Sequence, residues 1–120
     1  MNKSQQAMNA VCKTYQDLGY VRGQTDCVQF VLDYMEALGL NAPTIRYGRE
    51  ERLSAKTVMR YLGKPLPQGA HGDVVLCEQF LGLNPKTGHY ITMSKAEGEL
   101  VMATLPPEKK LLQWQVAEET

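Results

Sequence analysis

The sequence has no surplus of charge of either sign and no long apolar run. Among its 120 residues, Lys plus Arg and Asp plus Glu each number 13, so the formal net charge is zero. Phosphate binding needs a surplus of cations, so this balance argues against a nucleic-acid partner, and it gives no sign of an anionic membrane partner. No stretch approaches the roughly 18 apolar residues that span a bilayer. Residues 1–6 are polar, so we expect no secretion signal and a protein that is cytoplasmic when made.

Histidine and cysteine are also scarce. The chain has 2 histidines and 3 cysteines, and the spacing of Cys12, Cys27 and Cys77 contains no pair of the C-x-x-C type. Metal sites usually show such pairs, and a disulfide framework needs an oxidising compartment, so we expect no metal and at least one free thiol.

What is present is the composition of one ordinary globular domain. Apolar residues make up 43% of the chain and charged residues 22%. We find no repeat, low-complexity segment or linker, so residues 1–120 are expected to form a single domain.

Three amphipathic stretches predict helices in the first half of the chain. The first is capped by Ser4 and ends at Gly19, and the second is capped by Thr25 or Asp26 and ends at Gly39. The third follows a cap at Ser54 and reaches about Leu62, after a loop over residues 40–53.

After residue 67 the apolar period changes to that of strands. Strands are expected over residues 73–77, 88–93, 100–104 and 111–116, with turns at 84–88 and 97–98. Helices followed by strands indicate an α+β fold in which N-terminal helices pack on a C-terminal antiparallel sheet.

Cys27 is the candidate nucleophile because it stands in the first turn of the second expected helix. A helix N-terminus provides partial positive charge and free N–H groups, which stabilise a thiolate. The alternative is that Cys27 is a small buried hydrophobe, as free cysteines often are. Cys12 and Cys77 stand at no expected helix start, and Cys77, inside an apolar run, suits an inert core thiol.

A cysteine nucleophile needs a base, and His89 and His71 are the two choices. His89 follows a turn glycine and begins a strand, which in this kind of fold can lie against the helix that carries the cysteine. The alternative is a surface or half-buried strand residue. His71 lies in a polar loop flanked by prolines, so we interpret it as exposed and non-catalytic.

The order of these elements resembles that of the NlpC-type peptidases, a papain-like family that cuts peptide bonds in peptidoglycan stem peptides. Members carry a Tyr, a Gly, an Asp-Cys pair that opens a helix, a Gly-Asp pair before an apolar strand, and a His that begins another strand. The matching residues here are Tyr20, Gly23, Asp26-Cys27, Gly72-Asp73-Val74-Val75-Leu76 and Gly88-His89-Tyr90-Ile91. The resemblance covers roughly residues 16–104 and looks closest to short phage-encoded members found beside tail genes, which end in a strand bearing a Trp, here Trp114.

The resemblance implies a papain-like core and a cysteine peptidase or amidase that needs no cofactor. It implies that Cys27 is the nucleophile, that His89 is the general base, and that Tyr20 lies near the thiolate and helps to bind the oxyanion. The implied partners are a peptidoglycan peptide or another amide substrate and phage tail proteins, and the implied location is a virion.

Departures from the family pattern favour an alternative without catalysis. Val28 and Gln29 replace the Ser and Gly that usually follow the cysteine, and Met102 is nearest to the place of the residue that orients the histidine. Methionine cannot accept the imidazole N–H as a carboxylate does, and Glu97, Glu99 and Thr104 remain open as substitutes. The alternative is therefore a weak or inactive module of the same fold that serves assembly or partner binding.

Overall fold

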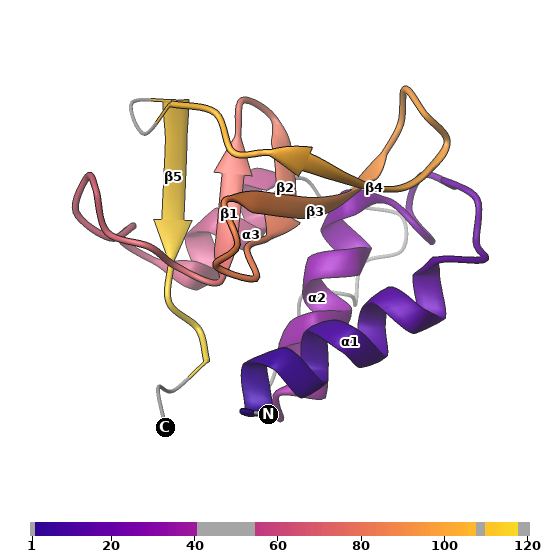
Figure 1. The fold of residues 1–120 in the computed structure, drawn as a ribbon, viewed down its shortest axis with the longest axis horizontal. Helices are drawn as coiled ribbons and strands as arrows, with labels where there is room; N and C mark the ends of the chain where they lie inside the picture. The colour runs from indigo at the N-terminus through magenta and orange to yellow at the C-terminus, as the bar shows by residue number, and fades with distance from the viewer. Residues whose placement is uncertain (1, 41–54, 108–109, 118–120) are drawn as a thin grey trace.

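The described residues of the protein form one antiparallel sheet with three helices (Figure 1). This computed structural model describes residues 2–40, 55–107 and 110–117. The helices are α1 (Lys3–Tyr15), α2 (Cys27–Ala37) and α3 (Ala55–Leu62), and the strands are β1 (Val74–Cys77), β2 (Phe80–Leu83), β3 (His89–Ser94), β4 (Glu99–Thr104) and β5 (Leu111–Trp114). The strand order is β4-β3-β2-β1-β5, and the α+β class is confirmed. In the described ranges, no helix has the length and apolar character that crossing a membrane requires.

The α2 helix begins as expected, with Asp26 as its N-cap. The α1 helix instead begins after Asn2, whose side chain accepts from the Gln5 N–H in a capping box, and it ends at Tyr15 before the expected Gly19. Ser4, the expected cap, lies inside α1. The expected cap Ser54 and residues 41–53 of the expected loop lie outside the described residues.

The β2 strand was not expected, and it changes the connection between β1 and β3. Phe80 pairs directly with Cys77, so only two residues form the hairpin turn. Turns of this length favour Gly or Asn in the left-handed region, but here Glu78 adopts a φ of 58°. The sequence therefore has no turn signal at this hairpin, and β2 is only four residues long.

The core lies between the helices and one face of the sheet. Strand register puts Val74 opposite Leu83 and Trp114, and Leu76 opposite Leu81, so these side chains share that face. They join a buried cluster with residues from all three helices, including Phe30 and Val31 of α2 and Val58 of α3. The helices pack on the sheet as the sequence predicts, and α2 lies along β2 and β3.

Close backbone packing joins the start of β1 to the end of β5. A Cβ on Gly72 would lie 2.2 Å from the carbonyl oxygen of Trp114, and the Gly72 N–H donates to Gln113 Oε1 at 3.0 Å. The Trp114 indole N–H donates to the Gly63 carbonyl at 3.1 Å, which holds the end of α3 against β5. The Gly72 position thus has no room for a side chain.

Candidate functional site

Cys27 is the first residue of α2 and is 7% exposed. The preceding residue, Asp26, accepts hydrogen bonds from the Gly23 N–H at 2.7 Å and the Gln29 N–H at 2.8 Å. These two bonds fix the loop before the helix and the first helical turn to one carboxylate. The helix start that the sequence predicts for Cys27 is therefore present.

The surroundings of Cys27 oppose its ionisation. Burial raises the pKa of the Cys27 thiol, and the neighbouring Asp26 carboxylate raises it further. The backbone N–H groups of Leu81, Cys27 and Val28 act in the other direction, because they stabilise a thiolate. Burial prevails, so the thiol remains protonated at neutral pH.

Tyr20 lies close enough to Asp26 and Cys27 for their charges to act on its hydroxyl. Its backbone N–H donates to the Gly98 carbonyl at 2.8 Å, which holds the loop before α2 against the turn between β3 and β4. Burial raises the pKa of the Tyr20 hydroxyl, and the charges of Asp26 and Cys27 raise it as well, whereas Arg22 lowers it. The structure thus brings Tyr20, Asp26 and Cys27 together.

His89 begins β3, as expected, but its side chain is exposed. Its Nδ1 lies 3.2 Å from the carbonyl oxygen of Thr87, and its cross-strand partner in β4 is Thr104. Among the described residues, the groups that shift the pKa of Cys27 do not include His89 or His71. His71 is exposed in its loop, as predicted.

Strand direction places Cys27 and His89 toward opposite ends of β3. Cys27 contacts the backbone of Leu81, and the Leu81 carbonyl accepts from Thr92 Oγ1 at 2.7 Å. The loop that leads to α2 is bound at Gly98, just beyond the Ser94 end of β3. His89 is at the other end of β3, and at about 3.3 Å per residue it lies about 10 Å along the strand from Thr92. In Figure 1, α2 starts on the side of the sheet where the turn between β3 and β4 lies.

The residues considered for orienting the histidine lie in β4 or next to it. Met102 is opposite Ile91 and its side chain is 63% exposed. Thr104, one of the substitutes that the sequence leaves open, is the residue opposite His89. The β3–β4 register therefore places Thr104, and not Met102, across from the imidazole.

The other two thiols do not join Cys27. Cys77 is at the end of β1 and only partly buried, so its interpretation as a core thiol is wrong. Burial and Glu78 raise the pKa of Cys77, while a hydrogen bond from the Tyr90 hydroxyl and the charge of Lys110 lower it. Burial also raises the pKa of Cys12 on α1.

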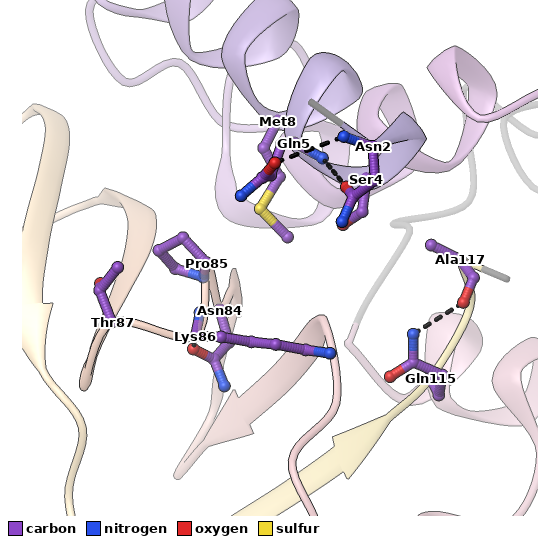
Figure 2. Close-up of a pocket in the computed structure, with 10 residues that line it drawn as sticks. All are labelled: Asn2, Ser4, Gln5, Met8, Asn84, Pro85, Lys86, Thr87, Gln115 and Ala117. Atoms are coloured by element: carbon purple, nitrogen blue, oxygen red, sulfur yellow. Dashed lines mark hydrogen bonds between the residues drawn. The ribbon is translucent and has the colours of Figure 1, made fainter. Parts of the chain in front are cut away.

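A pocket of about 330 Å³ lies elsewhere, between the start of α1, the turn after β2 and the segment after β5 (Figure 2). Polar and apolar atoms contribute about equally to its lining, which consists of Asn2, Ser4, Gln5, Met8, Asn84, Pro85, Lys86, Thr87, Gln115 and Ala117. None of Cys27, Tyr20 and His89 contributes to it. Within the described ranges, no group of three or more Cys, His, Asp or Glu residues could hold a metal ion.

The Leu81 N–H is the feature of the site that the sequence does not reveal. It is a backbone group on β2, and its position depends on a strand that the sequence does not indicate. No protein-family model, curated protein or solved structure matches the chain.

Proposed function

We propose that the chain has a papain-like, NlpC-type core and acts as a non-catalytic module that serves assembly or partner binding. The separation of Cys27 from His89 along β3 carries this proposal. The core itself is supported by a helix that opens with Asp26 and Cys27 and packs on β2 and β3 of an antiparallel sheet, and by a strand that begins after Gly72 and Asp73.

The chemistry of cysteine hydrolysis explains why this separation matters. The thiol must lose its proton to a base, which needs to be within hydrogen-bond reach, about 2.6–3.2 Å, or connected through one water. Cys27 instead has a pKa raised by burial, and the adjacent Asp26 carboxylate is bound to two backbone N–H groups. In this arrangement Cys27 is a packed helix-start residue, and Asp26 is its cap.

The proposal is tested by comparing the wild type with Cys27→Ala in two assays. In the first, both proteins are incubated with purified peptidoglycan and with tetrapeptide stems, and we expect no cysteine-dependent release of fragments. In the second, the gene carrying each form is placed in its native particle or host, and we expect equal assembly and infectivity. Two results overturn the proposal: cleavage that depends on Cys27, or a Cys27→Ala protein that folds like the wild type but no longer supports assembly.

The second candidate is a cysteine peptidase or amidase that acts on peptidoglycan stem peptides in a phage-tail setting. It is favoured by the three backbone N–H groups, from Leu81, Cys27 and Val28, that stabilise negative charge at the Cys27 sulfur. In that reaction Cys27 attacks the amide carbonyl to form an acyl-enzyme, and a base that reaches the thiol takes its proton and returns it to the leaving amine. This reaction requires His89 to approach Cys27. If the chain is such an enzyme, His89→Ala and Cys27→Ala each abolish cleavage.

A further inference from the structure

The β4 strand forms one edge of the sheet, and its outer side has no strand beside it in the described part of the chain. The opposite edge, β5, is partly covered, because the Leu66 N–H donates to the Gln113 carbonyl at 2.8 Å. An uncovered edge presents a row of backbone donors and acceptors that can pair with another strand.

The register identifies which groups point outward from β4. The Leu105 N–H donates to the Gly88 carbonyl at 3.1 Å, so residues 88 and 105 form a hydrogen-bonded pair just beyond the strand ends. Hydrogen-bonded pairs alternate along an antiparallel ladder, so Val101 and Ala103 bond inward to β3. The N–H and C=O groups of Leu100, Met102 and Thr104 therefore point away from the sheet.

This edge has few of the features by which proteins usually prevent strand pairing, since its one charged side chain is Glu99, at the first position of the strand. Residues 99–104 include no Lys, Pro or Gly, and Pro106 and Pro107 follow only after the strand has ended. Met102 is the most exposed of the large apolar side chains in the described residues, at 63%. Its backbone and its side chain are thus both available at the centre of the edge.

We propose that β4 pairs antiparallel with β4 of a second copy of this chain, with the two-fold axis at Met102. In this register Met102 faces its counterpart, and Leu100 faces Thr104 of the other copy, so the outward backbone groups of all three residues are satisfied. Glu99 faces Leu105 of the second copy, so no like charges stand opposite each other. The two sheets become one continuous sheet across the axis.

This inference rests on the proposed function in one respect: if the chain is an assembly module, a second copy of the chain is its partner. The pairing itself is argued from β4 alone. The strand is six residues long, so we expect a weak and concentration-dependent dimer. Dimer formation and cysteine-dependent cleavage are measured separately, so failure of one does not imply failure of the other.

The test is sedimentation velocity of the full chain over a wide range of protein concentration. We expect the wild-type mass to double as concentration rises, and Met102→Lys to remain at the mass of one chain, because its two cations meet at the axis. Val21→Lys is the matched control, since Val21 is 47% exposed on the loop before α2, and we expect it to dimerise as the wild type does. A wild type that stays monomeric throughout, or a Met102→Lys protein that dimerises equally well, overturns the proposal.

Amide hydrogen exchange identifies the surface without any substitution. We expect protection of the Leu100, Met102 and Thr104 amides to rise with protein concentration, while that of Val101 and Ala103, which already bond to β3, stays constant. A doubling of mass with new protection elsewhere, and none at these three amides, contradicts pairing through β4.

Discussion

The Tyr34 hydroxyl donates a hydrogen bond to Asp73 Oδ2 at 2.5 Å, across 39 residues of sequence. Both side chains are buried, and Asp73 also accepts the N–H groups of Val116 at 2.8 Å and Ala117 at 3.0 Å. One carboxylate therefore joins α2, the start of β1 and the segment that follows β5. The Gly-Asp pair that resembles a peptidase motif has a structural role here.

We expect Tyr34→Phe to lower the free energy of unfolding by about 1–3 kcal/mol, because it removes a donor and leaves the buried Asp73 carboxylate less satisfied. Urea denaturation followed by circular dichroism measures the change. Ser4→Ala is the control, since Ser4 Oγ lies 2.8 Å from the Tyr34 hydroxyl but does not bind Asp73. If the two variants lose the same free energy of unfolding, the hydrogen bond from Tyr34 to Asp73 contributes no more to stability than the contact with Ser4.

Gly72→Ala tests the close approach of β1 and β5. The added Cβ would lie 2.2 Å from the Trp114 oxygen, so the backbone must move, and we expect a loss of about 1–3 kcal/mol or more. Thermal unfolding measures it. The matched control is Gly19→Ala, where the nearest contact is the Gly98 oxygen at 3.8 Å and we expect little change. A Gly72→Ala protein as stable as this control would show that the two strands are not packed as described.

The buried hydroxyl of Tyr34 predicts a loss of stability at high pH. Burial and the hydrogen bond to Asp73 raise the pKa of Tyr34 above its ordinary value of about 10. A group whose folded pKa is raised contributes stability that is complete below the unfolded pKa and is lost as pH rises toward the folded pKa. We therefore expect the wild-type free energy of unfolding to fall above about pH 10, and Tyr34→Phe to reduce that slope.

The Cys27 thiol follows the same rule at lower pH, because burial also raises its pKa. Its contribution begins to be lost above about 8.5, the ordinary thiol value. Urea denaturation at a series of pH values separates the two groups, since Cys27→Ala should reduce the earlier decline and leave the later one. Part of the earlier decline remains in this variant, because burial raises the pKa of Cys12 and Cys77 as well. A stability that is constant from neutral to alkaline pH in the wild type contradicts both assignments.

Local chemistry made part of this fold predictable. Asp26 caps α2 because its short carboxylate reaches N–H groups within three residues, and a cap of this kind is visible in sequence. The change from helical to strand periodicity likewise indicated the α+β class. The position of Cys27 follows directly from the cap before it.

The placement of strands and side chains that are far apart in the sequence was harder to predict. The hairpin between β1 and β2 has Glu78 in the left-handed region, a conformation for which glutamate gives no signal. Because β2 was not expected, the predicted sheet has β3 one strand nearer to α2 than it is. The sequence also does not indicate in which direction the His89 side chain points. The end of β3 at which His89 lies depends on the β2–β3 and β3–β4 registers, which no short motif encodes.

Alkylation measured at each cysteine tests whether the Cys27 thiol is activated as a nucleophile. We expect folded wild-type protein to react with iodoacetamide slowly at Cys27, with a rate that rises only at alkaline pH, because burial raises the thiol pKa and limits access. His89→Ala should leave this profile unchanged, since His89 lies toward the other end of β3 from the Cys27 site. Mass spectrometry measures Cys12 and Cys77 in the same sample as internal references. If Cys27 reacts fastest well below about pH 8, and His89→Ala removes that advantage, a thiolate–imidazolium pair exists and the hydrolase candidate replaces the binding module.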